Sequence, residues 1–207
     1  MPKPPSPSVR HEVYSAMTLY LELLRHGETE QGGGLRGSLD DALTAAGWAQ
    51  LRAAVVGAGP WDRLVSSPLQ RCARFAAELA EQRGLSLSLE ADLQELHFGA
   101  WEGRSAAELM RTDADALGRF WADPYAFTPP GGEPMLAFEA RVLGALQRLQ
   151  MRHAGERLLL ITHGGVMRLL LAGARGLPPA DLLQVDVLHA QRFRLQLDRF
   201  GRLQELP

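Results

Sequence analysis

The chain has 207 residues, and 46% of them are hydrophobic, which is enough to bury a sizeable core in one globular domain. Its 22 basic and 24 acidic side chains nearly cancel, so no long basic face is available to bind nucleic acid. A single cysteine, Cys72, excludes an intramolecular disulfide framework and a cysteine-based metal site, which is typical of a protein from a reducing cytoplasm. No apolar run approaches the roughly 20 residues of a membrane span, so no membrane partner is expected.

Alternating apolar residues predict strands, and apolar residues at helical spacing predict helices. In chain order, the predicted elements are strand 19–24, helix 45–56 capped by Thr44, strand 62–65, helix 66–84 with Ser66 or Ser67 as its cap and Pro68 in its first turn, edge strand 85–89, helix 106–110, helix 135–151, strand 158–161, helix 164–171, and strands 184–188 and 192–197. Strands that alternate with helices predict an α/β fold, here a three-layer αβα sandwich with a mostly parallel central sheet. Ligands of such sheets bind at the carboxyl ends of the strands.

The domain organisation follows from composition. The proline-rich start has no apolar centre, so residues 1–17 are expected to form a disordered leader and residues 18–207 a single domain. Residues 104–133 contain an irregular stretch rich in proline and glycine, and the chain returns at once to a strong helical pattern. We therefore expect residues 104–133 to form a lid-like insertion.

Two predicted strands run directly into a histidine followed by glycine. Strand 19–24 continues into Arg25 and His26, and strand 158–161 continues into His163 and Gly164. Both histidines therefore fall at the ligand-binding edge of the sheet. A loop with four glycines over residues 31–37 follows the first histidine, and such a loop can bring backbone N–H groups close to an anion.

These residue types suit phosphate chemistry. Guanidinium groups bind tetrahedral oxyanions through paired hydrogen bonds, which makes Arg25 and Arg71 natural phosphate clamps. A neutral imidazole can then attack phosphorus, since neighbouring arginines lower its pKa. The leaving alkoxide needs a proton from a carboxylic acid, for which Glu95 is favoured over Glu102. Neither a metal-ligand pattern nor a P-loop is present, so no metal and no other cofactor is expected.

Four motifs, in this order, resemble those of the histidine phosphatase superfamily, the phosphoglycerate mutase-like proteins. The motifs are LRHGET at 24–29, SSPLQRCA at 66–73, ELHFGAWEG at 95–103 and THGG at 162–165. The resemblance implies that His26 is the phosphorylated nucleophile and Glu95 the proton donor. It implies a phosphate pocket completed by three further side chains, those of Arg25, Arg71 and His163. It also implies substrate contacts at Arg36, Gly37 and Gly164.

The resemblance assigns no catalytic role to other polar residues. Glu102 is expected to belong to a structural turn, and His97 to make a structural hydrogen bond. His11, His153 and His189 are expected to be ordinary. Several family members carry an asparagine at the sixth position after the nucleophile, where Gly32 stands here, and backbone donors of the glycine loop are expected to replace that side chain.

Within the family, the chain is most similar to the α-ribazole phosphatase branch. The short chain, the shortened glycine loop and the form of residues 93–99 carry this similarity, which implies hydrolysis of α-ribazole 5′-phosphate in cobalamin biosynthesis. Phosphoglycerate mutases usually carry a basic insertion, whereas acids offset the arginines of residues 104–133. A broad-specificity phosphatase or mutase-like enzyme, and a non-catalytic phosphate-binding protein, stay open as alternatives. The expected partner is a small-molecule phosphate ester, and no oligomeric state is predicted.

Overall fold

The computed structural model describes residues 18–207, so the expected leader at residues 1–17, with His11, lies outside the described residues. A six-stranded sheet forms the centre of the molecule, in the order β3-β2-β4-β1-β5-β6. The strands are β1 (Leu19–Arg25), β2 (Arg63–Ser66), β3 (Leu87–Leu89), β4 (Arg157–Thr162), β5 (Arg192–Leu197) and β6 (Leu203–Leu206). Strands β1 to β4 run parallel, and β5 and β6 are antiparallel to their neighbours. The predicted mostly parallel sheet is confirmed.

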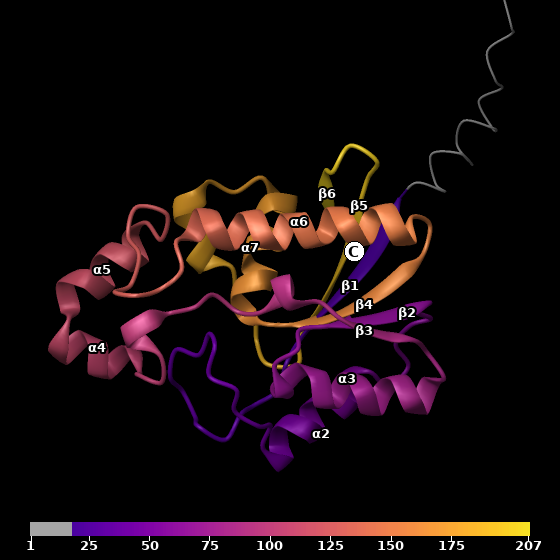
Figure 1. Ribbon diagram of the computed structural model, residues 1–207, viewed down its shortest axis with the longest axis horizontal. Helices are drawn as coiled ribbons and strands as arrows, with labels where there is room; N and C mark the ends of the chain where they lie inside the picture. The colour runs from indigo at the N-terminus through magenta and orange to yellow at the C-terminus, as the bar shows by residue number, and fades with distance from the viewer. Residues whose placement is uncertain (1–17) are drawn as a thin grey trace, which may run out of the picture.

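Helices cover both faces of the sheet (Figure 1). One face carries α2 (Ala45–Ala54) and α3 (Gln70–Arg83), and the other carries α6 (Met135–His153) and α7 (Gly164–Arg175). Two further helices, α4 (Ala106–Thr112) and α5 (Ala114–Ala122), extend from one end of the molecule, and three short 3-10 helices complete the list: η1 (Ala91–Leu93), η2 (Gly99–Trp101) and η3 (Pro179–Gln184). The α/β fold with three layers is therefore as predicted. Within residues 18–207, no helix has the length and apolar character to cross a membrane.

Strand β4 shows why the sheet needs both helical layers. Its residues Leu158 and Leu160 belong to the core cluster that contains residues of α6 and α7. The alternate residues Leu159 and Ile161 belong to the cluster that contains residues of α2 and α3. Successive side chains of a strand point to opposite faces, so a strand with four consecutive apolar residues has to be covered on both sides.

Two local predictions are wrong. Helix α3 begins at Gln70, so its N-cap residue is Leu69, which has no side-chain hydrogen bond to cap the helix. Pro68 therefore precedes the helix and does not lie in its first turn. The expected cap, Ser67, is used instead by His163, whose ring nitrogen Nε2 lies 2.7 Å from its hydroxyl oxygen. Residues 184–188 do not form a strand, although buried and exposed residues alternate along them as they would in one. The strand that pairs with the outer edge of β5 is instead β6.

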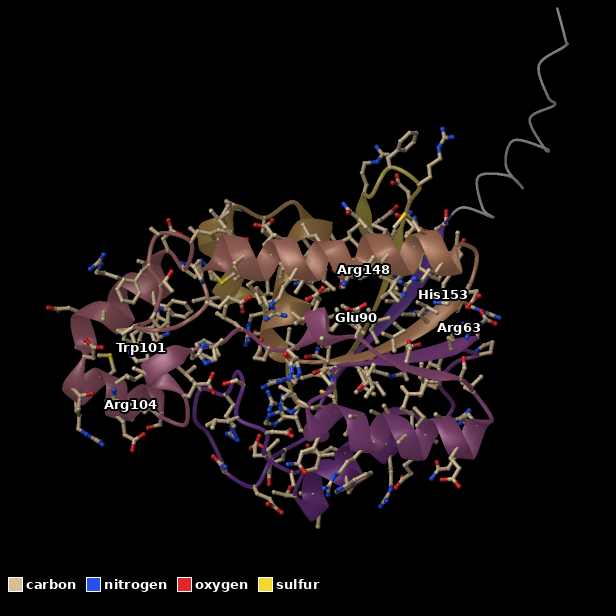
Figure 2. All side chains as sticks on the ribbon, viewed as in Figure 1. Arg63, Glu90, Trp101, Arg104, Arg148 and His153 are labelled. Atoms are coloured by element: carbon tan, nitrogen blue, oxygen red, sulfur yellow. The ribbon has the colours of Figure 1, made fainter. Side chains whose placement is uncertain are left out.

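The insertion at residues 104–133 contains two helices, of which the sequence predicted only the first. An aromatic cluster holds it in place, because buried Trp101 packs edge-on against Phe120 at 5.7 Å and stacks on Phe127 at 5.8 Å between ring centroids. The indole nitrogen of Trp101 donates to Asp113 at 3.2 Å. Figure 2 shows Trp101 and Arg104 where the chain enters this extension. Motion of the insertion as a lid stays a prediction.

Candidate active site

The two strand-ending histidines meet at the carboxyl edge of the sheet. Strands β1 and β4 are hydrogen-bonded neighbours, with Arg25 opposite Thr162 in the register. The residues that follow, His26 and His163, therefore lie side by side, with ring centroids 5.3 Å apart. The backbone N–H of His26 donates to the Thr162 carbonyl at 3.0 Å and fixes the two strand ends together. The predicted convergence of the histidines is confirmed.

The hydrogen bonding of His26 decides which of its nitrogens can react. Its Nδ1 lies 2.8 Å from the carbonyl oxygen of Gly27, and because a carbonyl only accepts, Nδ1 carries the proton. The lone pair is therefore on Nε2. Burial, with smaller contributions from Arg25 and Arg71, holds the pKa of His26 well below its usual 6.5. The ring is thus neutral and nucleophilic at neutral pH.

Gly27 allows the tight turn that aims His26. A Cβ added to Gly27 would lie only 2.3 Å from the carbonyl oxygen of Gly47 in α2. The strand end and the helix backbone are therefore in direct contact, and only glycine fits between them.

Arg71 is held by the protein from several directions. Its side chain is fully buried near the start of α3, and its Nη2 donates to the Gly37 carbonyl at 3.0 Å. Buried Asp41 lies 3.4 Å from Arg71 and 2.8 Å from Arg36, so one carboxylate joins the two guanidinium groups. A buried cation needs such a partner. Asp41 is not evident as a site residue from the sequence, because the Asp-Asp pair before α2 resembles ordinary surface charge.

His163 lies behind His26, and both of its ring nitrogens are bonded to protein. Nε of Arg71 donates to Nδ1 at 3.2 Å, which leaves the proton on Nε2 to be donated to the Ser67 hydroxyl at 2.7 Å. The residue is fully buried, and burial together with Arg71 holds its pKa well below 6.5. His163 is therefore a fixed, neutral ring next to His26.

Arg25 provides a donor aimed into the site. Its Nη1 donates to the Val187 carbonyl at 2.7 Å, but its Nε is a buried nitrogen without a hydrogen-bond partner among residues 18–207. This nitrogen lies beside Gly164, at 3.3 Å from the position of an added Cβ. Gly164 is the first residue of α7, and the amino end of a helix attracts anions. The arrangement is suited to binding an oxyanion.

Glu95 lies at the edge of the same site. Its Oε2 accepts from the backbone N–H of Gly165 in the first turn of α7 at 2.9 Å. A Cβ on Gly165 would lie 2.2 Å from Oε1, so the glycine gives the carboxylate its place. Arg141 of α6 donates to the carbonyl of Glu95 at 2.9 Å and to the carbonyls of Asp92 and Gln94 at 2.8 Å, which anchors the segment that carries the acid.

Glu102 is structural, as predicted. Its carboxylate accepts hydrogen bonds from the backbone N–H groups of Gly37, Ser38 and Phe98 at 3.0 Å. The N–H of Gly37 is therefore engaged by Glu102, and its carbonyl accepts from Arg71. Gly37 supports Arg71 from behind, and neither of its backbone groups is free to meet a substrate.

A cavity of about 390 Å³ opens beside Glu95 and Gly165. Most of its lining is aliphatic or aromatic and comes from the first loop, the insertion, α6 and η3. The lining residues are Leu35, Leu96, Phe98, Phe120, Trp121, Met135, Phe138, Leu182 and Leu183, with polar positions at Glu95, Arg168 and Gln184. A bound ester could place its apolar part here, with the reacting oxygen near Glu95.

His189, which the sequence analysis treated as ordinary, lies at the site. Its ring centroid is 5.6 Å from that of His26, on the loop between η3 and β5. No sequence motif marks it, because the contact joins residues far apart in the chain. Over residues 18–207, no group of three or more histidine, cysteine or acidic side chains is arranged to hold a metal ion.

Comparisons with known proteins identify the family of the chain. The profile of the Histidine phosphatase superfamily (branch 1) matches residues 21–205. The Adenosylcobalamin/alpha-ribazole phosphatase of Salmonella typhimurium is 32% identical over 166 residues, covering 78% of this chain and 82% of that protein. A Bifunctional protein of Mycobacterium tuberculosis is 34% identical over 183 residues; these cover 86% of this chain but only 47% of that protein, so the chain spans about half of its length.

Solved structures show the same fold. YhfR of Bacillus stearothermophilus superposes with a TM-score of 0.83 and 27% identity, over 90% of this chain and 95% of that one. A mycobacterial glucosyl-3-phosphoglycerate phosphatase in complex with inorganic phosphate superposes with a TM-score of 0.78 and 27% identity, over 90% and 94% of the two chains. The chain therefore belongs to branch 1 of the histidine phosphatase superfamily.

Proposed function

We propose that this chain is a phosphomonoesterase that works without a metal, through a phosphohistidine at His26, and hydrolyses α-ribazole 5′-phosphate. One observation carries the mechanism: the free lone pair of His26 Nε2 lies at a site where Arg25 presents an unpartnered N–H beside the amino end of α7. A nucleophile and a hydrogen-bond donor for an oxyanion are thus both directed to the place where a phosphoryl group would bind.

The reaction takes place in two balanced steps. In the first, Nε2 of His26 attacks phosphorus, the ester P–O bond breaks, and the Glu95 carboxylic acid gives its proton to the leaving alkoxide. In the second, the Glu95 carboxylate accepts a proton from water, the water oxygen attacks phosphorus, and the P–N bond breaks. Inorganic phosphate leaves, and both His26 and Glu95 return to their starting forms.

The remaining residues of the site bind or position the phosphate. Arg25 contacts the phosphoryl oxygens through Nε, and the backbone N–H of Gly164 supports them from the start of α7. Arg71 and His163 hold the nucleophile's surroundings in place, since the protein engages both side chains. Arg36 acts through Asp41, which it shares with Arg71.

The cavity beside Glu95 supports an ester with an aromatic alcohol. Its aromatic and aliphatic lining matches the benzimidazole of α-ribazole better than a small hydrophilic alcohol such as glycerate. The similarity to the Salmonella phosphatase points the same way. Arg168 in the cavity wall favours a second candidate, glucosyl-3-phosphoglycerate, because its guanidinium could pair with a carboxylate.

Substrate comparison tests the proposal. We expect kcat/KM for α-ribazole 5′-phosphate to exceed that for glucosyl-3-phosphoglycerate, 3-phosphoglycerate and simple sugar phosphates, in excess EDTA. Equal values for all esters would contradict the substrate assignment. Hydrolysis of a chromogenic aryl phosphate tests the mechanism. Loss of this activity in EDTA, or its survival in His26→Ala, would contradict the mechanism.

A further inference from the structure

His189 lies on the open side of the nucleophile. The rings of His26 and His189 are 5.6 Å apart between centroids, similar to the 5.3 Å between His26 and His163. The two neighbours differ in access, because His163 is fully buried with both nitrogens bonded whereas His189 is exposed to solvent. A phosphate ester has to approach from solvent, so it meets the His189 side.

The loop that carries His189 is fixed to the nucleophile's own strand end. The N–H of Ala190 donates to the His26 carbonyl at 3.2 Å, and the N–H of Arg25 donates to the Gln191 carbonyl at 3.1 Å. The Arg25 guanidinium binds the carbonyl of Val187 at 2.7 Å. Residues on both sides of His189 are therefore tied to Arg25 and His26.

The backbone next to His189 is strained. Ala190 has φ of +55°, and it is the one non-glycine residue with positive φ within residues 18–207. For an alanine this conformation is unfavourable, and such strain persists where surrounding contacts enforce it, often at functional sites. Here the enforcing contact is the hydrogen bond from Ala190 to His26.

The surroundings of His189 are charged. Partial burial of the ring is the largest cause that lowers its pKa; Arg25 and Arg36 lower it further, and Glu28 opposes them. The two guanidinium groups attract an anion to this side of the site.

We propose that the His189 imidazole donates a hydrogen bond to a phosphoryl oxygen during transfer to and from His26, which makes His189 a further catalytic residue. The inference rests on the proposed phosphohistidine mechanism. No proton is transferred by His189 in this role, so the two-step balance of the reaction is unchanged. A bound phosphate dianion next to the ring would favour its protonated form.

The direct test is an NMR titration of the full chain with and without inorganic phosphate, with the His189 signal assigned by its loss in His189→Gln. We expect phosphate to raise the pKa of His189. A ring that stays away from the bound phosphate would show no such rise, so an unchanged His189 titration under saturating phosphate would overturn the proposal.

Single-turnover kinetics give a second readout. His189→Ala should slow phosphorylation of His26 about 3- to 10-fold, the effect of one hydrogen bond, and His189→Gln, which keeps an N–H donor, should recover most of it. Leu188→Ala changes the exposed neighbour in the same loop and should leave the rate unchanged. Equal rates for all three variants and the parent would overturn the role of His189 while leaving the phosphohistidine intact; absence of any phosphohistidine in the parent would instead refute the proposed mechanism.

Discussion

Hydrogen bonds of single side chains determine which atoms of the site can react. The carbonyl of Gly27 holds the proton on Nδ1 of His26 and so leaves Nε2 without a proton. In contrast, both ring nitrogens of His163 are hydrogen-bonded, to Arg71 and to Ser67. Two histidines that look equivalent in the sequence therefore differ in which ring nitrogens are engaged by the protein. The difference arises from partners that are distant in the chain, which a local motif does not show.

Glu95 provides a prediction at this scale. Glu95→Gln keeps the size of the side chain but has no proton to give to the leaving alkoxide. We expect kcat to fall by roughly 10²- to 10⁴-fold for alkyl phosphates, the usual contribution of general acid catalysis, and far less for activated aryl phosphates. Steady-state assays with both ester classes measure this. Equal losses for the two would remove Glu95 from the acid role.

Whole segments are held in place by single charged residues. The Glu102 carboxylate gathers backbone N–H groups from the first loop and from Phe98, and Arg141 gathers the carbonyls of the segment that leads to Glu95. Each residue thus connects a loop of the site to the packed core. The first loop in turn supports Arg71 through the carbonyl of Gly37.

We expect Glu102→Ala to lower the free energy of unfolding by about 1–3 kcal/mol and to reduce kcat/KM, since it leaves several partly buried N–H groups without an acceptor. Urea unfolding and steady-state kinetics measure the two effects. Glu78→Gln, which removes a surface ion pair with Arg52, is the matched control and should change stability by less than about 1 kcal/mol. A Glu102→Ala variant as stable and active as this control would contradict the role.

Trp121 tests the cavity as the alcohol-binding site. It lies on α5, lines the cavity and is 49% exposed. Loss of an aromatic contact of about 0.5–1.5 kcal/mol predicts that Trp121→Ala raises KM for α-ribazole 5′-phosphate about 2- to 10-fold and leaves hydrolysis of a small sugar phosphate unchanged. Phe200→Ala, at an exposed aromatic residue that does not line the cavity, is the control. An equal effect on both esters would contradict the assignment.

At the element scale, the sequence predicted the strands and helices that have strong periodicity. The prediction was wrong where apolar residues alternate with polar ones outside any strand. Val185 and Val187 are buried on either side of exposed Asp186, which mimics a strand, but no neighbouring strand pairs with them. Helix α5 was missed because its apolar residues, Leu117 and Phe120, pack on the aromatic cluster around Trp101 in a stretch flanked by turn residues.

Across the whole molecule, the motifs located the site because chain order and parallel pairing bring their ends to one edge of the sheet. Arg25, His26 and His163 meet there as predicted. Asp41 and His189 could not be predicted, since each is defined by contacts with residues from other segments. The fold class was thus accessible from periodicity, whereas the electrostatic partners required three-dimensional contacts.

The buried histidines make stability depend on pH. Burial lowers the pKa values of His26 and His163 well below 6.5 in the folded state. The unfolded chain therefore binds more protons below pH 6.5, so stability is fully present above that pH and is lost as the pH falls below it, by up to about 1.4 kcal/mol per pH unit for each proton taken up. Urea unfolding between pH 7 and 5 should show the decline, and His163→Gln should make it shallower. An equal slope in both proteins would contradict the burial of neutral His163.

We expect His26 to carry the phosphoryl group during the reaction. Rapid quenching of the enzyme with a ³²P-labelled ester in excess EDTA, followed by identification of the labelled residue, tests it most directly. We predict acid-labile label on Nε2 of His26, formed within one turnover and absent in His26→Ala. Label on another residue, label that persists in His26→Ala, or rapid turnover with no labelled protein at any time would contradict the claim.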